Sequence, residues 1–263
     1  MAENIRYSIR VNAKIPIENF LGNNNRTNHS YFWLEDHDHG GREFRFTSSL
    51  LSSFQKSDEI VIVAEQLVSL FQGIYTLLDR NRIAVHYFTL GDIYDHENEI
   101  QIRNPRNIEI YKIDLDLASI PLLAENAPVN PIYILFEKIC TDPFLTNLFF
   151  LLSKKVDYRL LYMIYDDIRY FLRQQADNVF LKPYKSKLND FHHTANNYEV
   201  LGYYARHGRT AHDPPSSPMS LDDSKNLIFD IITKLLLEKC GITLPGYWGM
   251  NYITFSPMPR IDG

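Results

Sequence analysis

The hydrophobic pattern of this 263-residue chain changes its period part-way along the sequence. Apolar residues alternate with polar ones in short segments before residue 127, whereas after residue 142 they recur every three or four residues. A period of two is typical of strands with one face in water, and a period of 3.6 is typical of amphipathic helices. The pattern therefore predicts an α+β protein, with an N-terminal mixed α/β domain followed by a C-terminal antiparallel helical bundle.

Prolines and a change of charge place the boundary between the two domains. Pro128 and Pro131 interrupt the pattern, and the net charge is −6 over residues 1–141 but +1 over residues 142–245. We expect domains at 1–127 and 128–245, followed by an aromatic and proline-rich tail at 246–263. Phosphate binding needs a basic surface, so we expect the acidic N-terminal domain to sense or regulate rather than to bind nucleic acid.

Short segments of the N-terminal domain alternate branched and polar residues and predict strands. These segments are 5–17, 43–47, 83–88 and 108–113. Ser57 and Asp58 can cap a helix that runs along an apolar stripe to about Leu78.

Capping residues mark the helices of the C-terminal domain. An Asp or Ser stands before each of three apolar stripes, and Gly241 follows the last one. The predicted caps are Asp142, Asp157 and Ser220. Four helices are expected, at about 142–152, 157–172, 187–205 and 220–240.

Composition excludes several classes of protein. Two cysteines are too few for a disulfide framework or a four-thiolate metal site. The chain has no Walker A motif, no glycine-rich dinucleotide fingerprint and no Gly-x-Ser-x-Gly elbow. Charged residues stand near Met1 where a signal peptide would need an apolar run, and no apolar run reaches the length of a membrane span. We expect a cytoplasmic protein that uses no cofactor and no metal ion.

The third predicted helix carries an unusual set of polar residues. On a continuous helix, side chains at intervals of three or four residues share one face. This face would hold His192, Asn196, Glu199, Tyr203 and Arg206. The second predicted helix contains Asp166 and Asp167 within an apolar pattern, where they either face water or place a carboxylate against Arg206 or Arg209.

Two arginines and two histidines lie within seven residues at the expected end of the third helix. They are Arg206, His207, Arg209 and His212. The guanidinium group offers fixed donors that match phosphate, and imidazole exchanges protons near neutral pH. This combination suits phosphate-ester chemistry. The alternative is that cations gather at a helix C-terminus because they offset the helix dipole.

These residues resemble the HEPN superfamily (higher eukaryotes and prokaryotes nucleotide-binding), whose catalytic members carry Arg, a polar residue, several variable residues and His. Here Arg206 is followed by His207, and five residues separate Arg206 from His212. The resemblance covers about residues 142–240. It implies a metal-independent endoribonuclease that acts as a homodimer, often as a toxin or effector in defence against phage or plasmids.

The resemblance also implies roles for individual residues. His212 would act as general base or acid, and Arg206 would stabilise charge on the phosphoryl oxygens. Supporting contacts would come from His207, Asn196, Glu199 and Arg209. RNA is the implied substrate, and an antitoxin or a phage-derived trigger protein is an implied partner.

Two other functions fit the sequence. The polar helix face could serve a non-catalytic interaction module that binds a partner protein or a nucleotide. Alternatively, Asp36, His37, Asp38 and His39 alternate oxygen and nitrogen donors and could hold a divalent metal ion in a metal-dependent nuclease.

Overall fold

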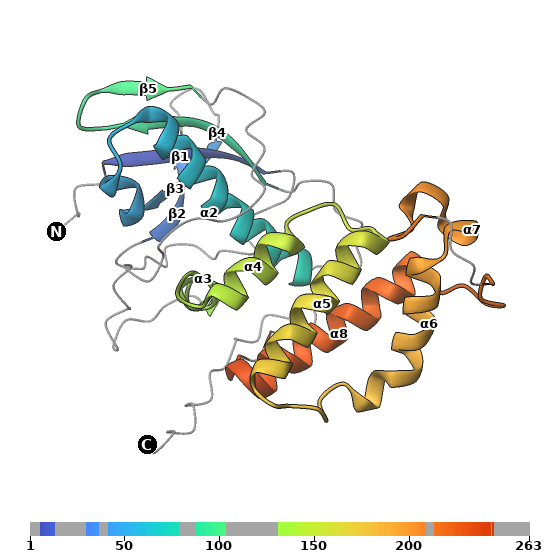
Figure 1. The fold of residues 1–263 in the computed structure, drawn as a ribbon. Coiled ribbons are helices and arrows are strands. Elements are labelled where there is room, and N and C mark those ends of the chain that lie inside the picture. Colours follow the sequence, from blue (N-terminus) through green and yellow to red (C-terminus); the bar gives the residue numbers. More distant parts are fainter. Residues whose placement is uncertain are drawn as a thin grey trace, which may run out of the picture. The chain divides into compact units, whose positions relative to one another are not determined.

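The computed structural model describes residues 6–13, 30–36, 42–78, 88–103, 131–208, 213–242 and 244. They form an α+β protein, as predicted, in two compact units. We call residues 1–75 with 85–153 the sheet unit, and residues 76–84 with 154–263 the helical unit. Figure 1 shows their elements.

The sheet unit contains a five-stranded antiparallel sheet in the order β2-β3-β1-β4-β5. Its strands are β1 Tyr7–Ala13, β2 Ser30–Asp36, β3 Arg42–Ser48, β4 Phe88–Asp95 and β5 Ile100–Ile102. The strands predicted within 5–17 and at 43–47 are confirmed as β1 and β3. The prediction at 108–113 lies outside the described residues, as does all of 83–88 except Phe88. The alternation did not predict β2, β5 or most of β4.

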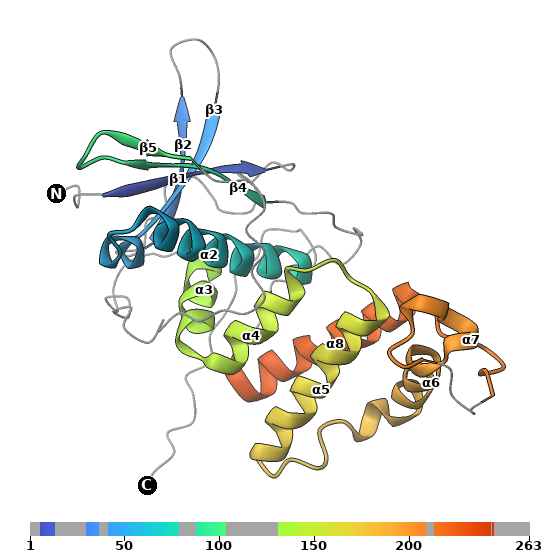
Figure 2. The ribbon, with the colours of Figure 1, turned by 45° about the horizontal axis from the view of Figure 1, so that its top comes forward.

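Helix α2, Ser57–Leu78, has the predicted bounds and lies along one face of the sheet (Figure 2). Its Phe71 packs edge-on against Phe46 of β3, with ring centroids 5.4 Å apart. By length and composition α2 could cross a membrane, and no other described helix passes that test. However, 83% of the apolar 18-residue segment of α2 that passes the test is buried inside the protein. Mostly buried core helices pass the same test.

Helices α3, Pro131–Thr141, and α4, Pro143–Leu152, complete the sheet unit. Phe136 of α3 stacks on Phe71 at 4.0 Å. A Cβ atom on Gly73 of α2 would lie 1.9 Å from the carbonyl oxygen of Phe149, so glycine is needed where α2 crosses α4. The contacts place the end of the sheet unit at Ser153, whereas the boundary expected at 127/128 lies outside the described residues. Pro131 begins a helix, where its missing N–H is not needed.

The helical unit consists of α5 Tyr158–Gln174, α6 Lys185–Asn196, the single turn α7 Tyr198–Leu201 and α8 Leu221–Cys240. Short 3-10 turns are η1 Ser49–Ser53 in the sheet unit, and η3 Lys182–Tyr184 and η4 Gly202–Tyr204 here. Helices α5 and α8 lie side by side and run in the same direction (Figures 1 and 2). Helix α6 runs in the opposite direction and leads the chain from the end of α5 back toward the start of α8. The first helix of the expected four-helix bundle, α4, belongs to the sheet unit instead.

Hydrogen bonds and ion pairs hold the ends of these helices together. The Tyr158 hydroxyl donates to the Met219 carbonyl at 2.8 Å, which joins the starts of α5 and α8. Beyond the end of α5, Asp177 pairs with Lys239 of α8 at 2.5 Å. Lys239 and the N–H groups of Val179 and Phe180 lower the pKa of Asp177 to about 2.

The predicted caps are confirmed. Asp142 accepts from the N–H groups of residues 144 and 145, Asp157 accepts from that of Leu160, and Ser220 accepts from that of Asp223. Gly241 ends α8 in the left-handed conformation, with φ 62°.

The third predicted helix, 187–205, is wrong in its second half. Helix α6 ends at Asn196, because the backbone of Asn197 adopts an extended conformation. The Asn197 side chain accepts a hydrogen bond from the Val200 N–H at 3.1 Å. An Asn at this point caps the new turn α7 and competes with continuation of α6. Gly202, with φ 55° and ψ −127°, then starts the turn η4.

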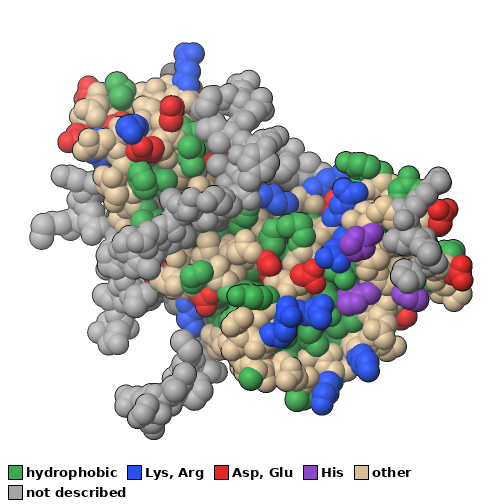
Figure 3. Space-filling model, in the orientation of Figure 1, with side chains coloured by type: hydrophobic (Ala, Val, Ile, Leu, Met, Phe, Trp, Pro, Cys, Tyr) green, Lys and Arg blue, Asp and Glu red, His purple; other side chains and the backbone are tan. Residues whose placement is uncertain are grey.

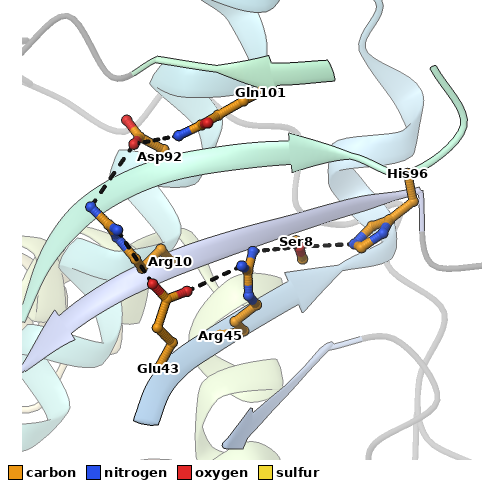
Figure 4. Close-up of polar contacts among 7 residues, drawn as sticks. All are labelled: Ser8, Arg10, Glu43, Arg45, Asp92, His96 and Gln101. Atoms are coloured by element: carbon orange, nitrogen blue, oxygen red, sulfur yellow. Dashed lines mark hydrogen bonds and ion pairs between the residues drawn. The ribbon is translucent and has the colours of Figure 1, made fainter. Parts of the chain in front are cut away.

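The face of the sheet opposite α2 carries a network of charged side chains (Figure 4). The Glu43 carboxylate accepts hydrogen bonds from Arg10 at 3.4 Å and from Arg45 at 3.1 Å. The guanidinium of Arg10 also lies 3.9 Å from the Asp92 carboxylate. These contacts cross-link β3, β1 and β4. Each arginine of the network therefore already has a carboxylate partner.

Candidate phosphate-binding site

The backbone of Arg206 is fixed to the end of α6. Its N–H donates to the carbonyl of Ala195 at 2.8 Å, so the chain after η4 returns to the helix it left. The end of α6 is itself held, because Thr194 accepts from the Met219 N–H at 2.9 Å. Arg206 is thus placed beside α6 although it does not belong to that helix.

The guanidinium of Arg206 rests on α5. It lies over the ring of Tyr162, 4.0 Å from the centroid, and its Nη2 is 3.2 Å from Oδ2 of Asp166. The side chains of Arg206 and Asp166 are 38% and 40% exposed. Both alternatives given for the carboxylates of the second helix apply in part to Asp166, which meets Arg206 and is also exposed to water.

Two side chains of α6 bring buried polar atoms to the same region. His192 packs its ring against Tyr162 and Tyr165, with centroids 5.2 and 4.7 Å apart. Nε2 of His192 and Oδ1 of Asn196 are buried and have no hydrogen-bond partner among the described residues. Buried polar atoms are normally paired, so these two mark a part of the structure whose hydrogen bonding is incomplete.

Burial lowers the pKa of His192 below its ordinary value. The positive charges of Arg169 and Arg206 act in the same direction, while Asp166 opposes them. The imidazole is therefore neutral at pH 7, with one ring nitrogen able to accept a hydrogen bond or a proton.

His207 completes the cluster. Its Nε2 lies 3.3 Å from Nη1 of Arg206. The imidazoles of the helical unit gather on one face, with basic and acidic side chains among them (Figure 3). The structure thus brings Arg206, His207 and His192 together around Tyr162 and Asp166. No contact among the described residues joins the Asn196 side chain to Arg206.

Other predicted residues are not in this cluster. Arg209 and His212 lie outside the described residues, so the spacing from Arg206 to His212 remains a prediction. Glu199 is exposed on α7, and no described hydrogen bond or ion pair joins it to Arg206. The expected single face of a continuous helix is therefore wrong for Glu199.

Three further residues of α5 belong to the site and were not predicted from the sequence. Tyr162, Tyr165 and Arg169 are spaced three and four residues apart, as expected of neighbours on one helix face. Arg169 lies 3.8 Å from Asp166 and over the ring of Tyr165. The signal was this polar and aromatic stripe, which runs beside the aliphatic stripe of the same helix.

Of the expected metal ligands at 36–39, only Asp36 belongs to the described residues. Asp36 ends β2, while residues 37–39 lie outside the described residues. Among the residues that are described, no three His, Cys, Asp or Glu side chains are grouped so that they could hold a metal ion.

Comparisons of the chain with protein-family models, with curated proteins and with solved structures found no match.

Proposed function

We propose that the helical unit is a HEPN-type domain that cleaves RNA without a metal ion. The observation that carries the proposal is the half-exposed guanidinium of Arg206, held between Tyr162 and Asp166 with a neutral imidazole beside the same tyrosine. Guanidinium binds phosphate through paired donors, and imidazole transfers protons.

The weakness of the contacts to Arg206 supports phosphate binding. An exposed ion pair contributes about 0.2–1 kcal/mol, and an exposed cation–π contact contributes about 0.5–1 kcal/mol. A phosphate can therefore draw the guanidinium away from Asp166, while the hydrogen bond from its backbone N–H keeps Arg206 in place.

The reaction would be an internal transfer at phosphorus. The ribose 2′-oxygen attacks the adjacent phosphorus while its proton passes to a base, and the bond from phosphorus to the 5′-oxygen breaks. The 5′-oxygen takes a proton, so the products are a 2′,3′-cyclic phosphate and a 5′-hydroxyl. Arg206 stabilises the charge on the phosphoryl oxygens, and His212 is the proposed base or acid. In a homodimer two such sites would face each other.

The test is cleavage of RNA by purified protein in EDTA, with identification of the termini. We expect Arg206→Ala and His212→Ala each to lower the rate at least a hundredfold, and the matched control Arg173→Ala of α5 to leave it unchanged. Cells that express the wild type would stop growing if the protein is a toxin, and those expressing either site variant would not. Equal cleavage by all variants, or cleavage abolished by EDTA, would contradict the proposal.

The second candidate is a cytoplasmic interaction module without catalysis. It is favoured by the contacts of Arg206 with Asp166 and Tyr162, which a residue with a purely structural role would also make. On this hypothesis wild-type protein does not cut RNA with or without its antitoxin or phage-derived trigger, and Arg206→Ala lowers stability only.

A further inference from the structure

Two large aromatic side chains are left in water next to Arg206. Tyr203 and Tyr204 are consecutive in η4 and are 76% and 58% exposed. Their rings meet edge to face, with centroids 5.7 Å apart. We call these two residues the tyrosine platform. Exposed tyrosines are typical of recognition surfaces, because the apolar ring can pack against a ligand while the hydroxyl stays hydrogen-bonded to water.

Arg159 of α5 fixes the platform in place. Its Nε donates to the carbonyl of Ala205 at 3.0 Å, and its Nη2 donates to the carbonyl of Tyr203. Its guanidinium also lies over the Tyr203 ring, 4.8 Å from the centroid. One face of this ring is thus covered by a cation, while most of the side chain remains exposed.

The platform and the phosphate site belong to one short stretch of backbone. Only Tyr204 and Ala205 separate Tyr203 from Arg206, and both ends of the stretch are tied to neighbouring helices. Arg159 holds the carbonyls of Tyr203 and Ala205, and Ala195 of α6 accepts from the Arg206 N–H. If the guanidinium of Arg206 holds the phosphate of a ligand, the neighbouring group of that ligand would therefore lie close to the tyrosine platform.

We propose that Tyr203 stacks an unpaired base of the RNA next to the phosphate that Arg206 binds and so positions the substrate. This inference rests on the proposed function. Every base has a face that stacks on an aromatic ring, and a cation on the far side of the ring strengthens a single-strand site. A base within a duplex is already stacked and cannot reach the ring.

Binding of a single-stranded oligonucleotide that cannot be cleaved tests the proposal without depending on catalysis. The probe is a fluorescent 2′-O-methyl RNA about eight residues long, and the Kd is measured by anisotropy for full-length protein. We expect Tyr203→Ala to weaken binding roughly tenfold and Tyr203→Phe to keep wild-type affinity, because stacking needs the ring and not the hydroxyl. Tyr170→Ala is the matched control, since Tyr170 is 61% exposed on α5.

Three results would overturn the proposal: no binding of the probe by wild type, equal Kd values for wild type and Tyr203→Ala, or equal affinity for a duplex of the same sequence. Sedimentation of the same proteins identifies the competing use of this surface. If Tyr203→Ala dissociates a dimer and leaves RNA affinity unchanged, the platform binds a second copy of the chain.

Cleavage of the same sequence with free 2′-hydroxyls separates the two proposals. Tyr203-dependent binding without cleavage by wild type would contradict the ribonuclease and support the stacking site. Cleavage that requires Arg206 but is unaffected by Tyr203→Ala would support the ribonuclease and contradict the stacking site.

Discussion

At the scale of the residue, the site depends on how firmly Arg206 is held. Its backbone is anchored on Ala195, while its charged group contacts the half-exposed Asp166 and the ring of Tyr162. A buried ion pair would resist exchange of partners, whereas an exposed pair contributes little and yields to a phosphate. The structure thus combines a fixed position with a guanidinium that is free to change partner.

His192 gives a prediction for the dependence of stability on pH. Burial lowers its pKa in the folded state, so as the pH falls below about 6.5 the unfolded chain takes up a proton before the folded one does. The unfolding free energy that neutral His192 contributes at neutral pH is therefore lost as the pH falls. We expect wild type to lose more unfolding free energy between about pH 7.5 and about pH 5 than His192→Gln, whose side chain does not titrate.

Urea unfolding at the two pH values measures this difference. Arg173→Ala, with His192 intact, should follow wild type. Parallel losses in wild type and His192→Gln would show that this imidazole does not titrate differently in the folded state.

At the scale of the element, the sequence predicts structure well where one local interaction decides it. Asp142, Asp157 and Ser220 cap helices as predicted, because the side chain needs only an N–H group two or three residues away. The aliphatic stripe of α2 likewise fixed its bounds. Asp166 was placed against Arg206 as one of two alternatives.

The sequence predicts less where two local preferences compete. Asn197 lies in a segment with helical spacing, yet its side chain caps a new turn and ends α6. Pro131 was interpreted as a boundary although proline also starts helices. The sequence carries the polar and aromatic stripe of α5 with Tyr162 and Arg169, but only the packing of α5 against α6 shows that this stripe belongs to the site.

Gly202 tests the importance of the turn that presents the tyrosine platform. Its φ of 55° with ψ −127° is a backbone conformation that L side chains rarely adopt, but no atom lies within 4 Å of the place that a Cβ atom would take. The penalty of Gly202→Ala is therefore conformational, about 1–3 kcal/mol of unfolding free energy. We also expect weaker binding of the single-stranded probe, because Tyr203 follows directly.

Gly208→Ala is the matched control for urea unfolding of this variant. Gly208 also has open space around it and no positive φ, so we expect a change within about 1 kcal/mol. Equal effects of the two substitutions would show that the turn at Gly202 is not strained by a side chain.

At the scale of the whole molecule, both units of the chain hold arginines against carboxylates or tyrosine rings. In the sheet unit the arginines of the β1–β3–β4 network are paired with Glu43 and Asp92. In the helical unit Arg159 and Arg206 lie over tyrosine rings, and Arg206 is paired with a carboxylate that is itself half exposed. Arg6 of the sheet unit likewise lies over a tyrosine ring and pairs with the exposed Glu97. RNA binding by the helical unit therefore rests on the cluster around Arg206 and remains a proposal, as does a sensing role for the N-terminal part.

The division into units predicts that each core can be weakened separately. Phe71 is 1% exposed and stacks on Phe136, so Phe71→Ala should lower the stability of the sheet unit by about 3–5 kcal/mol. Leu161 of α5 is fully buried, and Leu161→Ala is the matched change in the helical unit. Native-state hydrogen exchange should show faster exchange in α2 and β3 for the first variant, and in α5 and α8 for the second. Equal acceleration throughout the chain by either variant would mean that both units unfold as one, and a signal sensed by the sheet unit would then reach the RNA site through shared stability.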